Sequence, residues 1–358
     1  MNIFFRTDSS LSIGTGHLNR CINLADELKK MNNNIFFISR NLPGNSNFII
    51  KKRRYPILSL PKPTNYSITD NYNDWLGIPW FEDLNQTIKV ISKLNKVVHW
   101  MIIDHYSLDQ NWESNIRNIA KKVLVIDGPI HNKHYCDILL NSNYLKKSNN
   151  HYIKKINYDC KLLLGSKYCL IKNEKKLLKN KKNEKKYIRL LIFYGGIDIN
   201  NQTLRALKSI KHIRNKLVYT NLVIGKNNPN KKELLRYSKN LKNIKVHIQT
   251  KKMYDLITNS DIGLCAGGIN TWERLYLGLP SIVTAVSKNQ ESSLKKLNTT
   301  NSIVYLGSYQ NVTIKKISEN INLLLKNKSR LKNMSKIGKK LVDGRGVQRV
   351  SQIIKKLS

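Results

Sequence analysis

The chain has 358 residues and a formal net charge of +40 at pH 7, with 63 Lys and Arg residues against 23 Asp and Glu. This length exceeds what a single core usually supports, and a hydrophobic content of 41% suffices for ordinary cores, so two domains are expected. No apolar stretch is long enough to span a bilayer, and the first residues form a strand pattern rather than a signal peptide. We therefore expect a soluble, cytoplasmic protein without membrane insertion.

The positive charge also raises the possibility of a nucleic-acid partner, since Lys and Arg patches release counterions from phosphate backbones. Here the basic residues are mostly Lys mixed with Asn, spread along the chain rather than interleaved with aromatic residues on one face. A genome poor in G and C produces the same composition. We expect no specific nucleic-acid partner, and strong salt-sensitive binding to one defined nucleic acid would overturn that expectation.

The cysteine and carboxylate patterns give no sign of a metal centre. The five cysteines lack CxxC spacing, which favours buried thiols over disulfides or zinc. The acidic residues near the predicted loops, Asp8, Asp104, Asp127 and Asp198, have no recognisable ligand spacing. We expect metal-independent chemistry and no cofactor.

The first twenty residues are the most informative. An apolar run at 3–5 leads into a loop with Gly14, Gly16 and His17, and then into a helical pattern. Glycines at such a turn allow close approach to a ligand, and the free N–H groups of the helix start favour anions. Asn19 occupies the place of the third dinucleotide-fingerprint glycine, and no Lys-Ser/Thr pair follows, so neither a nicotinamide, flavin nor Walker A site is indicated. His17 is either a proton-transfer residue or simply a surface histidine at a tight turn.

Strand and helix patterns alternate along both halves of the chain, as in right-handed βαβ units. Apolar runs at 35–39, 101–104, 123–127 and 137–141 predict buried parallel strands, with helices at 85–94 and 111–120. A Lys/Asn/Glu-rich segment then separates this part from a second series at 188–194, 217–224, 244–248, 262–265 and 281–285, with a helix at 201–211. The sequence predicts an α/β protein with two Rossmann-like domains: residues 1–171, a charged linker at 172–187, and residues 188–358.

Ligands of open α/β sheets bind outside the carboxyl ends of the strands, where both halves carry polar residues or glycine. If the two parallel sheets face each other across a cleft, these groups converge on one small-molecule site. They are Gly14 to His17, Asp104 to Tyr106, Asp127, Asn141, Asn143, Gly195, Gly196, Gly267 and Gly268.

The strongest motif of the second half runs from Cys265 to Glu273 and on to Gly278-Leu279-Pro280. A strand ends, Gly267 and Gly268 make the turn, and a helix begins whose N–H groups and dipole suit a diphosphate. Glu273, in the first turn, could accept hydrogen bonds from two ribose hydroxyls, or it could merely complement the helix dipole. After the next strand, the amides of Asn289 and Gln290 could bind a sugar or a diphosphate.

These residues resemble those of known families. The order of strand, Gly-Gly, Thr-x-x-Glu, Gly-Leu-Pro and Asn-Gln is similar to the nucleotide-binding half of GT-B fold glycosyltransferases, especially the peptidoglycan N-acetylglucosaminyltransferase. A narrower resemblance, nearly from end to end, is to the UDP-2,4-diacetamido-2,4,6-trideoxy-β-L-altropyranose hydrolases of pseudaminic acid biosynthesis. It rests on Arg6-Thr7-Asp8, Gly14-Thr15-Gly16-His17, Arg20-Cys21, Ile103-Asp104-His105-Tyr106, the segment 136–141, Gly195-Gly196-x-Asp198 and Asp343-Gly344-Arg345-Gly346.

The resemblance implies a GT-B architecture that releases UDP and a free sugar from a small-molecule UDP-sugar, with water as the acceptor. It implies that His17 is the catalytic histidine and Glu273 the ribose-binding carboxylate. Sugar-nucleotide contacts are implied for Asn289 and the glycines at 195, 196, 267 and 268. The predicted substrate-binding set comprises Gly14, Gly16, Asn141, Gly195, Gly196, Asp198, Gly267, Gly268, Glu273, Asn289 and Gln290.

The residues fit a direct displacement. A neutral imidazole can remove a proton from water as it attacks the anomeric carbon from the face opposite UDP, which inverts that centre. Asp8 is expected to orient His17, although capping of the loop explains it nearly as well, and Tyr106 to point its hydroxyl at the sugar or water. His105 is expected to be structural, and Arg6 to pair with a nearby carboxylate.

Two alternatives stay open at this point. One is a GT-B glycosyltransferase that passes the sugar to a lipid or protein acceptor, and the other is a non-catalytic binding protein. A two-domain chain of this size can act as a monomer.

Overall fold

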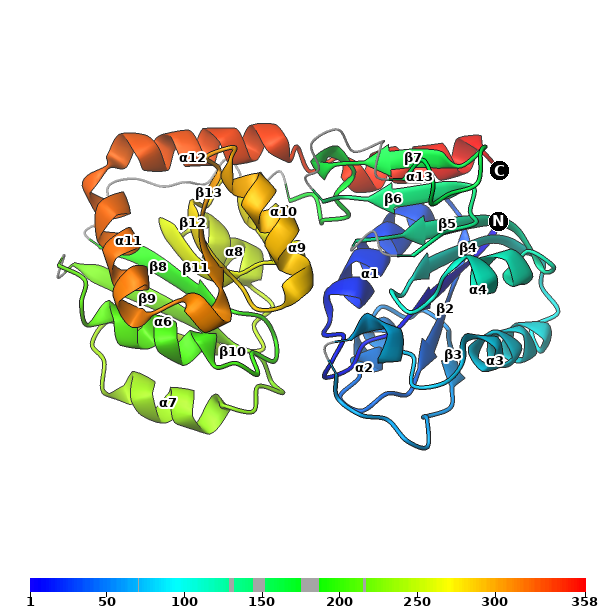
Figure 1. Ribbon diagram of the computed structural model, residues 1–358, viewed down its shortest axis with the longest axis horizontal. Coiled ribbons are helices and arrows are strands. Elements are labelled where there is room, and N and C mark those ends of the chain that lie inside the picture. The colour runs from blue at the N-terminus through cyan, green and yellow to red at the C-terminus, as the bar shows by residue number, and fades with distance from the viewer. Residues whose placement is uncertain (70, 129–131, 144–151, 175–186, 215–216) are drawn as a thin grey trace. The chain divides into compact units, whose positions relative to one another are not determined.

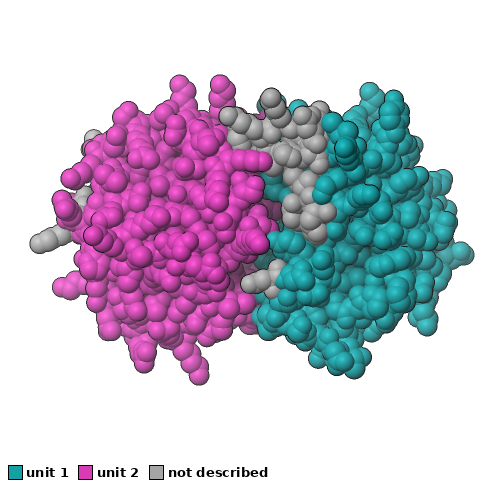
Figure 2. Space-filling view, in the orientation of Figure 1, with its two compact units in different colours: residues 1–171, 345–358 teal, residues 172–344 magenta. Residues whose placement is uncertain are grey.

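The computed structural model describes residues 1–69, 71–128, 132–143, 152–174, 187–214 and 217–358. It divides the chain into two compact units (Figure 2): unit 1 comprises residues 1–171 and 345–358, and unit 2 comprises residues 172–344. No helix among these described residues combines the length and apolar character needed to cross a membrane.

Unit 1 is built on a seven-stranded parallel sheet in the order β3-β2-β1-β4-β5-β6-β7 (Figure 1). The strands are β1 (Asn2–Thr7), β2 (Asn34–Arg40), β3 (Ile57–Leu60), β4 (Val98–Asp104), β5 (Ala120–Ile126), β6 (Ile138–Asn141) and β7 (Lys161–Leu164). Successive side chains of β1 belong to opposite faces: Ile3 and Phe5 enter one core, while Phe4 enters the other. Burial on both faces explains the continuous apolar runs of the sequence.

Helices cover both faces of this sheet. They are α1 (Gly16–Lys30), α2 (Asn47–Lys52), α3 (Trp80–Ser92), α4 (Gln110–Ile116) and α13 (Gly346–Lys356). Leu18 of α1 and Val350 of α13 share the core of Ile3 and Phe5, whereas Leu84 of α3 and Trp112 of α4 share that of Phe4. The sheet is therefore doubly wound, and its β1 and β4 are central strands.

Unit 2 repeats the plan with a six-stranded parallel sheet in the order β10-β9-β8-β11-β12-β13. Its strands are β8 (Ile188–Phe193), β9 (Val218–Ile224), β10 (Ile244–Ile248), β11 (Ile262–Ala266), β12 (Ser281–Ala285) and β13 (Ile303–Ser308). Its helices are α6 (Gln202–Ile210), α7 (Lys231–Lys239), α8 (Met253–Thr258), α9 (Ile269–Leu277), α10 (Lys288–Asn298), α11 (Ile314–Lys326) and α12 (Lys328–Leu341). The predicted α/β class with two Rossmann-like parallel sheets is confirmed.

The C-terminal segment departs from the predicted domain division. The sequence assigns residues 188–358 to one domain, but residues 345–358 pack with unit 1, where Val350 and Ile354 enter the α1 core. Gly346 permits this return, because a Cβ there would lie 2.2 Å from the Cys169 carbonyl oxygen. Most of the predicted linker, residues 175–186, lies outside the described residues, and residues 172–174 belong to unit 2.

Truncating a side chain of α13 should therefore destabilise unit 1. Ile354 is fully buried, so Ile354→Ala should cost about 2–5 kcal/mol of unfolding free energy, because it removes apolar surface and leaves a cavity. Hydrogen exchange read by peptide mass should show lost protection in residues 1–171, with unit 2 peptides unchanged. Leu324→Ala, in the core of unit 2, is the matched control and should give the reverse pattern. Equal loss in both units for Ile354→Ala would contradict the division.

Candidate functional site

The loop that follows β1 sets the position of His17. Gly14 has a φ of +72° and its N–H donates to the Ser10 carbonyl at 2.9 Å, which closes a tight turn. The Ser10 hydroxyl accepts from the N–H groups of Ser12 and Ile13 at 3.2 and 3.0 Å. Helix α1 begins two residues later, so His17 lies in its first turn, at the carboxyl end of the central strand β1.

His17 is paired with a carboxylate from the neighbouring central strand. Its Nδ1 lies 2.5 Å from Oδ1 of Asp104, the last residue of β4, and both side chains are buried. Arg20, one turn further along α1, grips the same carboxylate with two bonds: Nε to Oδ2 at 2.6 Å and Nη2 to Oδ1 at 2.5 Å. Residues three apart on a helix share a face, which is why both reach Asp104.

The electrostatics of this group define the state of the imidazole. Burial opposes ionisation of Asp104, but the charges and hydrogen bonds of Arg20 and His17 hold its pKa well below its usual range. Burial lowers the pKa of His17 below 6.5, Asp104 partly offsets this, and Arg20 adds to it. An ionised Asp104 accepts a hydrogen bond from Nδ1–H, so at neutral pH the lone pair of a neutral His17 lies on Nε2.

Aromatic rings surround the imidazole. The His17 ring meets the Tyr106 ring edge to face at a centroid distance of 4.5 Å and that of Trp75 at 5.8 Å. The Tyr106 hydroxyl also accepts from Arg20 Nη2 at 3.3 Å. Ile13, Leu42, Trp75 and Tyr106 form one apolar cluster around this loop. Such a frame fixes the ring orientation and limits the water that reaches it.

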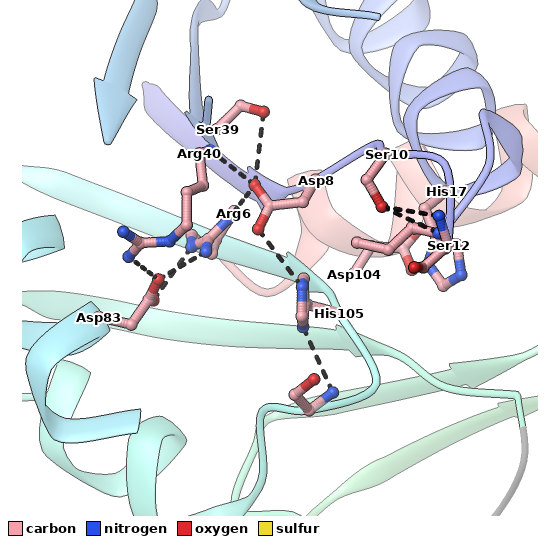
Figure 3. A network of polar contacts seen from close by, with 12 residues as sticks. Arg6, Asp8, Ser10, Ser12, His17, Ser39, Arg40, Asp83, Asp104 and His105 are labelled. Carbon is pink, nitrogen blue, oxygen red and sulfur yellow. Dashed lines mark hydrogen bonds and ion pairs between the residues drawn. The ribbon is translucent and has the colours of Figure 1, made fainter. Parts of the chain in front are cut away.

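Asp8 does not orient His17, so that prediction is wrong. Its Oδ1 accepts from Arg6 Nη1 at 2.6 Å and from the Arg40 N–H at 2.7 Å, and its Oδ2 lies 3.3 Å from His105 Nε2. Figure 3 shows Asp8 engaged by Arg6 and His105, whereas Asp104 lies beside His17. Arg6 also binds Asp83 on α3, which accounts for its burial. Asp8 therefore serves as the anchor of the loop, and the expected pairing of Arg6 is confirmed.

Asn141 is fully buried and already bonded within unit 1. Its Nδ2 donates to the Tyr152 hydroxyl at 2.7 Å, and its Oδ1 accepts from the Asn143 N–H at 2.9 Å. Tyr152 in turn donates to Asp127 at 2.5 Å. This network holds Gly128 beside Tyr106, where a Cβ would lie 2.1 Å from the Tyr106 hydroxyl oxygen. Asn141 thus helps to hold Gly128 against Tyr106. Its direct contact with a ligand stays a prediction.

In unit 2, the glycines after β8 leave that strand end open, whereas Gly267 after β11 packs closely, since a Cβ there would lie 2.7 Å from Gln290 Oε1. Gly195 has a φ of +100°, and no atom lies within 4 Å of a Cβ built there or on Gly196. Gly268, with a φ of +93°, precedes α9 directly. Asp198 caps α6, because its carboxylate accepts from the N–H groups of Gln202 and Thr203 at 2.9 Å each. The carboxylate of Asp198 is therefore already bonded to the start of α6, and its contact with a ligand stays a prediction.

Glu273 projects from the first half of α9 with two polar neighbours. Its carboxylate accepts from Asn270 Nδ2 at 2.5 Å and from the Tyr254 hydroxyl of α8 at 3.2 Å. Burial raises the pKa of Glu273. Gln290 accepts from the Val286 N–H at 3.1 Å, and Asn289 accepts from the Ser287 hydroxyl at 2.5 Å, so both amides lie at the start of α10. Acceptors of this kind suit the hydroxyls of a ribose or sugar.

Three neighbours of the site have no role predicted from the sequence, although one of them, Arg20, belongs to the Arg20-Cys21 motif. Arg20 could have been found from its spacing three residues after His17. Trp75 and Tyr254 carry no local signal, since each reaches its partner from a distant segment. Among the described residues, no group of three or more His, Cys, Asp or Glu side chains is placed to hold a metal ion.

Comparison with known proteins supplies a context for this geometry. Residues 190–350 match the glycosyltransferase family 28 C-terminal domain. The chain is 29% identical over 317 residues to an uncharacterised protein of Methanocaldococcus jannaschii, covering 84% of this chain and 60% of that relative. It is 28% identical over 294 residues to the UDP-2,4-diacetamido-2,4,6-trideoxy-beta-L-altropyranose hydrolase of Campylobacter jejuni, covering 82% of this chain and 94% of that enzyme.

A solved structure supports the fold. MurG of Acinetobacter baumannii superposes with a TM-score of 0.66 at 11% identity, covering 99% of each chain. The chain therefore has the GT-B type of fold, with two Rossmann-like units, and it resembles the Campylobacter hydrolase as the sequence motifs indicate.

The charges around His17 make a prediction about its titration. NMR of the histidine ring should give His17 a pKa below 6.5, with His17→Gln identifying the resonance. Asp104→Asn removes the neighbouring negative charge and should lower that pKa further, whereas Arg20→Gln removes a positive charge and should raise it. Movement of both variants in the same direction would show that this electrostatic description is incorrect.

Proposed function

We propose that the chain is a hydrolase that cleaves the anomeric bond of a UDP-linked amino-deoxy sugar, releasing UDP and the free sugar. The observation that carries the proposal is the buried His17–Asp104 pair at the carboxyl ends of β1 and β4. Similarity to the Campylobacter hydrolase over most of the chain supports UDP-2,4-diacetamido-2,4,6-trideoxy-β-L-altropyranose as the substrate, and pseudaminic acid biosynthesis as its context.

The chemistry begins with a neutral imidazole. His17 Nε2 removes a proton from water as the water oxygen attacks the anomeric carbon, and Asp104 stabilises the imidazolium through Nδ1. Attack opposite the departing UDP inverts the centre. Tyr106 is assigned to the sugar or the water, since its ring packs on His17 and its hydroxyl is held by Arg20.

Unit 2 is assigned the UDP moiety. The N–H groups at Gly268 and the start of α9 suit the diphosphate, whose negative charge requires donors and a helix dipole rather than an acid catalyst. Glu273 is assigned the ribose hydroxyls. Gly195, Gly196 and Gly267, with Asn289 and Gln290, complete the proposed contacts in this unit, and Gly14 and Gly16 those in unit 1.

One alternative has a specific observation in its favour. The match to the glycosyltransferase family 28 C-terminal domain is equally compatible with transfer of the sugar to a lipid or protein acceptor. Water and acceptor transfer differ in product, so NMR of a reaction without any added acceptor separates them. Release of free sugar and UDP supports the hydrolase, whereas turnover that requires an acceptor identifies a transferase.

Replacing the base should abolish turnover without abolishing nucleotide binding. His17→Phe keeps an aromatic ring against Tyr106 and Trp75 but removes the proton acceptor, so kcat should fall on the order of 10² to 10⁴-fold. UDP affinity measured by calorimetry should be unchanged, and the exposed His212→Gln is the control for both assays.

In the wild type, kcat/KM should decline only as pH falls through the His17 pKa below 6.5, because protonation removes the base. Full activity in EDTA is expected, and loss of turnover there would contradict metal independence.

The assignment of Glu273 predicts discrimination between nucleotides. Charged hydrogen bonds contribute about 1.5–3 kcal/mol, so Glu273→Ala should weaken UDP binding roughly 10- to 100-fold. The wild type should prefer UDP over 2′-deoxy-UDP, because the deoxynucleotide lacks one of the two hydroxyls that Glu273 binds. The variant lacks the carboxylate and should therefore lose this preference. Glu291→Ala on α10 is the matched control and should bind both like the wild type. Retained discrimination in Glu273→Ala would refute the ribose contact.

A further inference from the structure

Two cysteines that are distant in sequence lie together at the amino ends of β6 and β7. The sulfur atoms of Cys136 and Cys160 are 3.6 Å apart. Both are free thiols in the structure, and the lack of CxxC spacing favoured unpaired thiols. The fold therefore creates a proximity that the sequence pattern does not reveal.

The backbone around the two cysteines suits a covalent link. β6 and β7 are parallel neighbours with Ile138 opposite Lys161, and the Lys161 N–H donates to the Asp137 carbonyl at 2.8 Å. Cys160 directly precedes Lys161, whereas Cys136 lies two residues before Ile138, so the two cysteines are offset by one position and meet through their side chains. The sulfurs need only approach from 3.6 Å to about 2.05 Å. Small side-chain rotations and a slight backbone shift can supply that change.

Exposure distinguishes Cys160 from the other four thiols. Cys160 is partly exposed, whereas Cys136, Cys21, Cys169 and Cys265 are buried. The hydrogen bond between the two sulfurs, together with burial, raises the pKa of Cys136. Cys136 therefore stays protonated beside Cys160, and Cys160 is the thiol that a dissolved oxidant reaches first.

We propose that Cys136 and Cys160 are a reversible oxidation site that forms an intramolecular disulfide. Hydrogen peroxide converts the Cys160 thiol to a sulfenic acid and releases one water. The Cys136 sulfur then attacks the Cys160 sulfur, forms the S–S bond and expels the sulfenic oxygen as a second water, which carries the Cys136 proton. Two thiols are oxidised and one peroxide is reduced to two waters. Two equivalents of a thiol reductant reverse the reaction by exchange.

The disulfide would stabilise the segment of unit 1 that holds Asp127 and Gly128 next to Tyr106. The ring closed between residues 136 and 160 contains Asn141, which donates to the Gly128 carbonyl, and Tyr152, which donates to Asp127. A cross-link that restricts the unfolded chain stabilises the folded one, so oxidation should raise the thermal midpoint of unfolding. This inference does not depend on the proposed activity.

The test is peptide mass mapping of the whole protein before and after hydrogen peroxide in slight molar excess, with rapid alkylation under denaturing conditions. The expected result is a species lighter by two hydrogens, three alkylated cysteines, and a linked peptide pair containing Cys136 and Cys160. Dithiothreitol should restore five alkylated cysteines. An oxidised Cys160 that accumulates as sulfinic acid with Cys136 alkylated, or five thiols that remain free, would overturn the proposal.

Variants make the test specific. Cys160→Ser lies at a partly exposed position and should abolish the two-hydrogen loss and the rise in thermal midpoint. Cys265→Ala, which removes a buried thiol of unit 2, is the matched control and should still form the link. Oxidation of urea-unfolded protein should scatter the pairing among several cysteines. Equal formation of the pair in folded and unfolded protein would show that the fold does not direct it.

Discussion

The central constraint on this structure is the burial of the Asp104 carboxylate at the end of β4. A buried charge requires bonded partners, and the partners of Asp104 are Arg20 and His17, which lie on one face of α1. That requirement fixes the start of α1 against the central strands. It also leaves the imidazole with one nitrogen committed and the other available as a base. The same interaction thus stabilises the fold and prepares a catalytic group.

A second buried carboxylate network serves the loop rather than the chemistry. Asp8 and Asp83 share Arg6, and Asp83 also binds Arg40 Nη2 at 2.6 Å. Removing Arg6 would take the bonded guanidinium from Asp8 and leave Asp83 with Arg40 alone, and losing a partner in a buried network costs much more than the net contribution of an intact pair. The network therefore anchors the end of β1, where the His17 loop begins, to β2 and α3. It explains why several charged residues lie at the end of β1 although only His17 is placed for proton transfer.

Local patterns predicted much of this, and long-range contacts explain the rest. Apolar runs and glycine turns located most strands and the His17 loop, because both are encoded within a few residues. From the sequence, Asp8 is the expected partner of His17, because the two residues are only nine positions apart. Asp104 lies 87 residues away and is brought near by the β1–β4 pairing. The return of α13 to unit 1 and the Cys136–Cys160 proximity likewise depend on tertiary packing that periodicity does not encode.

The most direct test of the account is to run the reaction in water labelled with oxygen-18 and weigh the UDP that is released. Attack by His17-activated water on the anomeric carbon leaves the bridging oxygen on UDP, so the released UDP should carry no label. Attack on phosphorus would place one labelled oxygen in UDP. Unlabelled UDP, formed without an acceptor and lost in His17→Phe, is the result the account predicts. Labelled UDP, or unlabelled UDP formed at an undiminished rate by His17→Phe, would contradict it.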